Sequence, residues 1–392
     1  MTNDLQTQSD MGQTSSPTGA GRSVAIIGTR GYPSYYGGFE TAVRKLAPFL
    51  ADRGWDVTVY GRTGSTLDDD PQRDPRVVTR VTRGLETKSL STLSYGLTAS
   101  MDAVRRKPDV ALVMNVANGY FLPMLKARGI PSLVNVDGIE WDRAKWGRLA
   151  KTVFHTGAKW TARHGDRLVY DSKEIGRRWK SEFGREGDFI PYGGDEPAEL
   201  AVEPGLTHRG YILLVARFVP ENTVPEFVEA AESLSKTYPV VIVGSSGYGG
   251  EIDTRVAALA ERNPNVRWLG HVSDDDRLLS LWQHAGVYFH GHSVGGTNPA
   301  LVQAMAAGAP VVARDTVYNR EVLGDNAILT PPIASDISRV VTAAMENSEL
   351  RLASSVENVV RARTHYSWHG VNSRYEQALL DLIPAPSRKS SR

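Results

Sequence analysis

The chain has 392 residues, of which 41% are hydrophobic and 23% charged, and it carries a formal net charge of +1. These values are typical of a globular protein with two domains, and the balanced charge argues against a protein that binds nucleic acid. Because the chain contains no cysteine, disulfides and cysteine-ligated metals are excluded, and a reducing cytoplasm is a compatible location.

The two ends of the chain have the composition of disordered segments. Residues 1–22 are rich in Ser, Thr, Gln and Gly and contain no apolar run, so we expect a disordered leader rather than a signal peptide. Residues 384–392 are expected to form a disordered tail. No apolar run approaches the roughly 18 to 20 residues that span a bilayer.

A first series of alternating strands and helices begins at Val24. The run Val24–Gly28 is apolar and β-branched, which is typical of a buried strand. A Gly-rich loop, a helical pattern and a second strand follow, and this βαβ order predicts a parallel sheet covered by helices. The helix is predicted at Thr41–Arg53 and the later strands at Val57–Tyr60, Val110–Met114, Ser132–Val136 and Arg167–Tyr170. We assign residues 23–200 to this first domain.

A loose segment rich in Gly, Pro and acidic residues, Gly194–Gly210, is the predicted linker to a second α/β series over residues 205–365. Its predicted strands are Tyr211–Ala216, Val240–Gly244, Val266–Leu269, Val287–His290 and Pro310–Ala313, and its predicted helices are Val224–Lys236, Glu251–Arg262 and Asp275–His284. The sequence therefore predicts an α/β fold of two Rossmann-like domains. Ligands are expected in the cleft between them, beyond the carboxyl ends of the strands.

The most informative motif is a Gly-rich loop that precedes a helix in the second domain. The loop comprises Gly295, Gly296, Thr297 and Asn298. Asn298 is the predicted N-cap because Pro299 and a run of good helix formers follow it. Unpaired backbone N–H groups at the positive end of a helix suit a phosphate or diphosphate. An ordinary strand-to-helix turn is the alternative interpretation.

Other residues of the second domain are expected to face the same ligand. Arg217 follows the first strand of this domain, where a guanidinium can form a fork to a diphosphate; an exposed surface Arg is the alternative. Asn222 lies five residues further on, and Gln303 lies in the second turn of the helix that Asn298 caps.

The first domain has a Gly-rich turn of its own. Gly37 and Gly38 allow a ligand to approach the backbone, and Glu40 follows them at the start of a predicted helix. The spacing does not match the dinucleotide-binding fingerprint G-x-G-x-x-G. The alternative is an ordinary βαβ turn in which Glu40 complements the helix dipole.

Acidic residues follow two further strands of the first domain. Asp137 and Glu140 come after one strand and Asp171 after the next, and such groups can orient hydroxyls or accept a proton. The alternatives are a D-G turn at Asp137, a helix cap at Glu140 and an N-cap at Asp171.

The segment from Arg143 to Arg167 is basic and aromatic, with seven Lys or Arg residues against one acid. This composition suits an anionic membrane surface or a lipid diphosphate, so we expect peripheral membrane contact through the first domain. A solvated helix face is the alternative. The histidines lack the spacing of metal ligands, and no metal site is predicted.

Taken together, these motifs resemble those of the retaining family-4 glycosyltransferases of the GT-B fold. More narrowly, they resemble those of bacterial rhamnosyltransferases that act on lipid-diphosphate-linked sugars. The resemblance runs from about Val24 to about Pro332, and it implies a C-terminal helix near residues 366–383 that crosses back to the first domain. It rests on G-T-R-G-Y-P…Y-G-G-F-E, N-V-D-G-I-E-W-D-R-A-K-W, R-F-V-P-E-N and H-G-H-S-V-G-G-T-N-P.

The resemblance implies a role for each candidate residue. Arg217 would hold the donor diphosphate, and Asp137 and Asp171 would face the acceptor and the transferred sugar as catalytic residues. Asn222 stands where the wider family has Lys, and Gln303 where it generally has a Glu that binds the nucleotide ribose. The donor side comprises Gly37, Gly38, Arg217, Asn222, Gly295, Gly296, Thr297, Asn298 and Gln303. The acceptor side comprises Glu40, Glu140, Arg143 and Lys145.

The implied reaction uses no cofactor and no metal. L-rhamnose would move from dTDP-L-rhamnose to a lipid-linked saccharide at the inner face of the cytoplasmic membrane, with retention of configuration and the departing phosphate available as a base. Two alternatives remain open: a nucleotide-sugar epimerase on the same fold, and a nucleotide-sugar-binding protein whose catalysis is impaired by Gln303 and Asn222.

Overall fold

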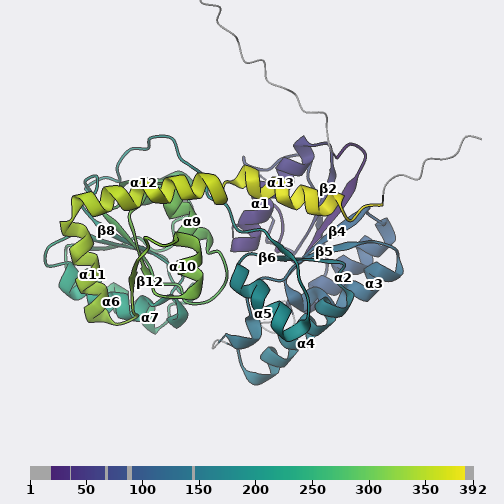
Figure 1. The fold of residues 1–392 in the computed structure, drawn as a ribbon, viewed down its shortest axis with the longest axis horizontal. Coiled ribbons are helices and arrows are strands. Elements are labelled where there is room, and N and C mark those ends of the chain that lie inside the picture. Colours follow the sequence, from purple (N-terminus) through teal and green to yellow (C-terminus); the bar gives the residue numbers. More distant parts are fainter. Residues whose placement is uncertain (1–18, 36, 67–68, 86–90, 144–145, 385–392) are drawn as a thin grey trace, which may run out of the picture.

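We describe a computed structural model of residues 19–384, apart from residues 36, 67–68, 86–90 and 144–145. The predicted leader over residues 1–18, the predicted tail over residues 385–392 and Lys145 lie outside the described residues. Two α/β lobes lie side by side, and the last two helices run across both of them (Figure 1).

The first lobe contains a parallel sheet with the strand order β3-β2-β1-β4-β5-β6-β7. Its strands are β1 Ser23–Ile27, β2 Asp56–Gly61, β3 Val78–Val81, β4 Val110–Met114, β5 Ser132–Asn135, β6 Arg167–Tyr170 and β7 Asp188–Phe189. Its helices are α1 Gly38–Asp52, α2 Ser91–Arg106, α3 Leu122–Ala127, α4 Arg148–His164 and α5 Lys173–Phe183, with 3-10 helices η1 Val116–Phe121 and η2 Glu140–Asp142. The central strands are buried on both faces, which explains their unbroken apolar sequences.

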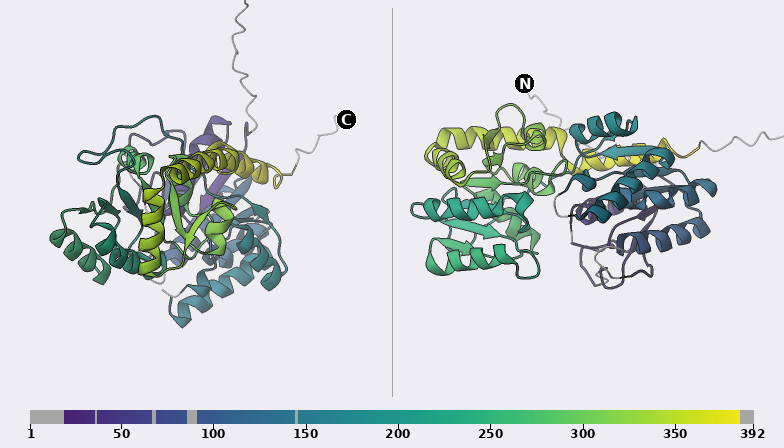
Figure 2. Two further views of the ribbon diagram at one scale, coloured as in Figure 1. Left: turned by 60° about the vertical axis from the view of Figure 1, so that its left-hand side comes forward. Right: turned by 90° about the horizontal axis from the view of Figure 1, so that it is seen from below.

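The second lobe repeats this topology with the strand order β10-β9-β8-β11-β12-β13, again all parallel. Its strands are β8 Ile212–Val215, β9 Val240–Val243, β10 Val266–Trp268, β11 Val287–His290, β12 Val311–Arg314 and β13 Ile328–Thr330. Its helices are η3 Pro220–Asn222, α6 Val224–Leu234, α7 Glu251–Arg262, α8 Asp275–His284, α9 Pro299–Ala306, α10 Val317–Leu323 and α11 Ala334–Glu346. In both lobes helices cover the two faces of the sheet (Figure 2).

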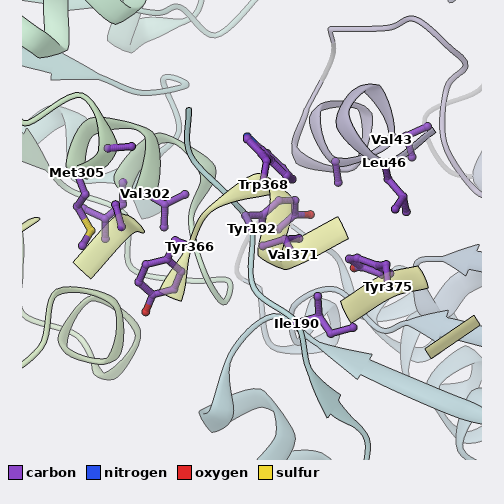
Figure 3. Packing of buried hydrophobic residues seen from close by; sticks show 14 of the residues in the cluster. Val43, Leu46, Ile190, Tyr192, Val302, Met305, Tyr366, Trp368, Val371 and Tyr375 are labelled. Atoms are coloured by element: carbon purple, nitrogen blue, oxygen red, sulfur yellow. The ribbon is translucent and has the colours of Figure 1, made fainter. Parts of the chain in front are cut away.

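Two segments of the chain connect the lobes, and they lie side by side. The helix α12 Ser348–His365 lies on the second lobe, and α13 Trp368–Leu380 packs against α1 of the first. Between these helices Ser367 pairs with Gly194 of the outgoing linker, and the Gly194 N–H donates to the Tyr366 carbonyl at 2.8 Å. Buried apolar side chains from both lobes surround the crossing (Figure 3).

These two parallel-sheet lobes confirm the predicted fold class. Many predicted elements coincide with observed ones, and α7, α8, β4, β6 and β11 match residue for residue. The sequence analysis missed the edge strands β3, β7 and β13, which are short and only partly apolar. It also gave Asp171 as the alternative N-cap of α5, which is wrong: the Ser172 hydroxyl caps that helix by accepting from the Glu174 N–H.

Candidate active site

A cleft of about 1210 Å³ lies between the lobes, where the carboxyl ends of both sheets face each other. Every candidate residue from the sequence lines this cleft except Lys145, which the structure does not describe. The lining candidates are Gly37, Gly38, Glu40, Asp137, Glu140, Arg143, Asp171, Arg217, Asn222, Gly295, Gly296, Thr297, Asn298 and Gln303. The two-lobe topology alone therefore gathers residues that are far apart in the sequence.

The Asn298 cap of α9 forms as its sequence predicts, but the Thr297 N–H is not unpaired as expected, because it donates to the Asp171 carbonyl at 3.1 Å. The Asn298 side chain accepts from the Ala300 N–H at 3.0 Å, and Pro299 occupies the first helical position. The loop turns at Gly295, whose φ of +97° favours glycine. Gly296 is required by the other lobe, because a Cβ atom there would lie 2.0 Å from an Asp171 carboxylate oxygen. The amide end of α9 thus opens on the cleft while its loop touches the first lobe.

Arg217 lies two residues beyond the end of β8 and lines the cleft. Asn222 is buried, and its side-chain N–H donates to the Arg217 carbonyl at 2.9 Å. Asn222 therefore bonds to the backbone of Arg217 and stabilises the loop that carries Arg217.

Gln303 makes two hydrogen bonds to the linker. Its carbonyl oxygen accepts from the Asp195 N–H at 3.0 Å, and its amide N–H donates to the Asp195 carbonyl at 2.7 Å. A carboxylate could make only the first of these bonds, because it has no proton to donate. The structure therefore gives a reason for glutamine at a position where the resemblance leads us to expect glutamate.

Asp171 is the most perturbed carboxyl in the described part of the first lobe. It is 5% exposed, and one of its carboxylate oxygens is buried without a hydrogen-bond partner. Burial raises the pKa of Asp171 well above its ordinary value, and the neighbouring Asp137 and Glu321 carboxylates raise it further. Its backbone carbonyl accepts from both the N–H and the hydroxyl of Thr297, so Asp171 lies directly against the α9 loop.

Asp137 adopts a left-handed conformation with φ +62°, at the predicted D-G turn after β5. Asn115, which follows β4, is also left-handed, with φ +71°, and its side-chain N–H donates to the Asp137 carboxylate at 3.3 Å. Non-glycine residues with positive φ are uncommon, although Asn and Asp adopt this conformation more readily than other residues. The strained pair aligns polar side chains at the ends of two adjacent strands.

Arg143 connects the two walls of the cleft. Its guanidinium donates to Glu140 at 2.5 Å within the first lobe and to Glu221 of the second lobe. Burial lowers the pKa of Arg143, but the two carboxylates more than offset this, so the guanidinium stays charged. The Trp146 N–H donates to the other Glu140 oxygen at 2.7 Å. The alternative that Glu140 caps a helix is wrong, because no cap bond forms at η2.

Glu40 stabilises the Gly-rich turn of the first lobe. It is 6% exposed, and its carboxylate accepts from the Arg30 N–H at 3.0 Å. Gly38 begins α1 so close to the second lobe that a Cβ atom would lie 3.4 Å from Pro299. Both glycines of this turn therefore line the cleft beside the α9 loop.

Sequence reasoning missed other residues around the cleft. Asn115 and His292 each lie just beyond a strand, and the strand-end rule could have identified them. Glu321 could not be found in this way, because it comes from α10. It accepts from the Lys173 N–H at 2.8 Å and from the Ser172 hydroxyl at 2.9 Å, so a second-lobe carboxylate lies at the N-terminus of α5.

The described residues contain no group of three or more His, Cys, Asp or Glu side chains placed to hold a metal ion. None of the described helices combines the length with the apolar character that crossing a membrane requires.

The comparisons define the class of fold and of domain: the two lobes have the GT-B fold, and each lobe matches a glycosyltransferase domain. In particular, residues 199–357 match the model described as glycosyl transferases group 1, and residues 37–193 match the glycosyl transferase 4-like domain.

Relatives with known names are moderately similar to the chain. It is 31% identical over 214 residues to a phosphatidyl-myo-inositol mannosyltransferase of Mycolicibacterium smegmatis, covering 51% of this chain and 54% of the relative. It is 23% identical over 192 residues to O-antigen chain mannosyltransferase B of Escherichia coli, covering 48% and 50%. The chain thus spans about half the length of the curated relatives it matches.

Solved structures show the same fold at low identity. Sucrose-phosphate synthase from Thermosynechococcus elongatus superposes with a TM-score of 0.77 at 16% identity, over 92% of this chain and 99% of that chain. HepE of Anabaena in complex with UDP-glucose superposes with a TM-score of 0.71 at 14% identity, over 92% and 100%.

Proposed function

We propose that the chain is a retaining, metal-independent glycosyltransferase that moves L-rhamnose from dTDP-L-rhamnose to a lipid-diphosphate-linked saccharide. The observation that carries this proposal is the contrast across the cleft. Arg217 and the amide end of α9 line one wall, and Asp137, Glu140 and Asp171 line the other. Such a division suits a diphosphate on one side and sugar hydroxyls on the other.

The second-lobe wall supports the departure of a nucleoside diphosphate. A guanidinium forks to phosphate oxygens, and the helix N-terminus supplies N–H groups and a partial positive charge. Preorganised donors of this kind stabilise the charge that develops on a leaving group. Because these groups offset part of the negative charge of a diphosphate, we propose that this step uses no metal ion.

The first-lobe wall supports the handling of the two sugars. Asp137 and Asp171 accept or donate hydrogen bonds to hydroxyls, and the departing phosphate takes the acceptor proton. The contacts of Asp171 with Thr297 and Gly296 hold the loop of one wall against the other. Closure of the cleft excludes water and aligns the acceptor.

The choice of a thymidine nucleotide is supported by Gln303. The Glu that the resemblance leads us to expect has about four lone-pair sites and can accept from both ribose hydroxyls. The Gln303 carbonyl already accepts from Asp195, so it has one acceptor site left, which suits the single 3′-hydroxyl of a 2′-deoxyribose. The named relatives are mannosyltransferases, so guanosine diphosphate mannose is the competing donor.

A panel experiment tests the donor. The protein is heated with dTDP-L-rhamnose, GDP-mannose or UDP-glucose, and a donor that binds raises Tm in proportion to RT ln(1 + [L]/Kd). We expect dTDP-L-rhamnose to give the largest shift and to transfer labelled sugar to a lipid-linked acceptor. A shift with GDP-mannose alone contradicts the rhamnose proposal. Binding without transfer supports the impaired binding protein, and donor consumption without an acceptor supports an epimerase.

Peripheral membrane contact is proposed through α4. Leu149 is 80% exposed and Trp160 41% exposed on this helix, and Arg148, Lys159 and Arg163 are exposed beside them. Exposed apolar groups among cations suit an anionic lipid surface. We expect co-sedimentation with anionic vesicles at low salt, reduced in a Leu149→Glu, Trp160→Glu variant. Equal binding to neutral vesicles, or none to anionic ones, contradicts this proposal.

A further inference from the structure

His292 lies at the point where the second sheet is expected to bind its ligand. In the order β9-β8-β11-β12, the strands β8 and β11 are neighbours that connect in opposite directions along the sheet. Ligands of open parallel sheets bind beyond the carboxyl ends at such a switch point. Arg217 follows β8 by two residues and His292 follows β11 by two residues, and both line the cleft.

The imidazole of His292 is held in a fixed orientation. It stacks on His290, with the ring centroids 4.5 Å apart and an interplanar angle of 11°. His290 is itself fully buried and bonds through Nδ1 to the Tyr288 hydroxyl at 2.9 Å. The backbone of His292 is fixed as well, because the Asn319 side chain donates to its carbonyl at 3.0 Å.

The surroundings of His292 keep the imidazole ring neutral. Burial lowers its pKa to about 3, and the positive charges of Arg217 and Arg143 contribute. A neutral imidazole carries one N–H and one acceptor nitrogen. Nδ1 is buried and has no hydrogen-bond partner. Because a buried N–H without an acceptor is rare, the proton is expected on Nε2.

Nε2 is therefore a neutral donor in a cleft wall where Arg217 is the charged group at the switch point. We propose that His292 donates a hydrogen bond from Nε2 to the diphosphate of the nucleotide-sugar and stabilises it as it leaves. This assignment rests on the proposed function of the cleft. It adds a second side chain to the anion site, and it gives the H-G-H sequence before the Gly-rich loop a chemical role.

The experiment measures calorimetric binding of dTDP and UDP, and of dTMP and UMP, to the wild-type protein, to Arg217→Ala and to three further variants. His292→Phe keeps an aromatic ring on His290 but removes the N–H. His292→Gln keeps an N–H near the position of Nε2. His365→Ala is the matched control, because His365 is exposed on α12 outside the cleft.

We expect His292→Phe to weaken diphosphate binding about tenfold, which corresponds to about 1.4 kcal/mol, while monophosphate binding changes little. His292→Gln should recover most of the affinity, and His365→Ala should behave as wild type. If His292→Phe has a lowered Tm, His292→Leu replaces it as the variant without an N–H.

Two outcomes overturn the inference in distinguishable ways. If the N–H-free variants bind the diphosphates as tightly as wild type while Arg217→Ala does not, His292 only supports the strand end and the proposed function stands. If the wild-type protein binds neither diphosphate, the proposed function fails and the inference fails with it.

Discussion

The two walls of the cleft are built on the same parallel-sheet topology, yet different chemical groups follow their strands. The second-lobe wall presents Arg217, the amide end of α9 and a neutral His292, whereas the first-lobe wall presents the carboxyl groups of Asp137, Glu140 and Asp171 together with cationic side chains such as Arg143. In both walls the chemical groups lie in loops beyond strand ends, and the strands themselves are apolar. The comparison teaches that the shared fold determines where the loops lie, whereas the side chains in those loops determine the function.

The largest expected effect is on the second-lobe wall. Arg217→Ala should lower kcat/KM about 10³-fold, because it removes the charged donor that we propose stabilises the leaving diphosphate. The measurement is a transfer assay with the donor that the panel identifies, together with Tm as a test of folding. Arg255→Ala, on the outer surface of α7, is the control. If the Arg217→Ala protein folds and keeps wild-type activity, Arg217 does not stabilise the diphosphate, and the proposed contrast between the two walls is wrong.

The next effect is on the first-lobe wall. Asp171→Asn should lower kcat/KM about tenfold, because it weakens the hydrogen bond that we propose Asp171 makes with a sugar hydroxyl, and it should raise Tm at neutral pH. The direction of the Tm change follows from the pKa of Asp171, which folding raises. The stability that Asp171 contributes is fully present below its pKa in the unfolded state. That stability is lost as pH rises through its higher pKa in the folded state, where the buried carboxyl ionises. Tm of the variant should therefore depend less on pH in that upward range. An unchanged pH profile would show that Asp171 titrates normally.

A third prediction tests the difference between this chain and the resemblance. If Gln303 impaired catalysis by replacing a glutamate that binds the ribose, the Gln303→Glu variant should gain activity. The structure predicts a loss instead, because a glutamate replaces the donor to the Asp195 carbonyl with a second acceptor. We expect destabilisation by about 2 kcal/mol and weaker donor binding. Chemical denaturation measures the change in stability, and the binding assay measures the change in donor affinity. A gain in donor affinity would favour the alternative in which Gln303 impairs the site.

The smallest effect is expected where the walls meet. Glu221→Gln removes one of the two carboxylates that hold Arg143, while Glu140 still pairs with it. We expect KM for the donor to rise about threefold, because closure of the cleft loses one ion pair. We also expect KM of the variant to depend less on salt concentration than KM of the wild type. Asp315→Asn, which breaks an exposed ion pair with Arg320 away from the cleft, is the control. Equal responses in both variants would mean that the pair across the cleft has no special role.

The sequence predicted the parts of the molecule that local chemistry determines. Buried strands such as β4 and β11 follow from β-branched runs, and the Asn298 cap and Pro299 follow from residue preferences at helix ends. Contacts between the lobes were not predictable from one sequence. The bonds of Gln303 to Asp195, the ion pair of Arg143 with Glu221 and the approach of Glu321 to α5 all join residues more than 70 positions apart. Periodicity and spacing carry no information about such pairs.

The paired crossing of the chain at Gly194 and Ser367 constrains how the lobes can move. Sliding one lobe past the other would shear the bond from the Gly194 N–H to the Tyr366 carbonyl, whereas a swing about that line would leave it intact. We therefore expect the lobes to move relative to each other chiefly by rotation about this line. Substitutions near the line should then change closure of the cleft more than the chemistry within it.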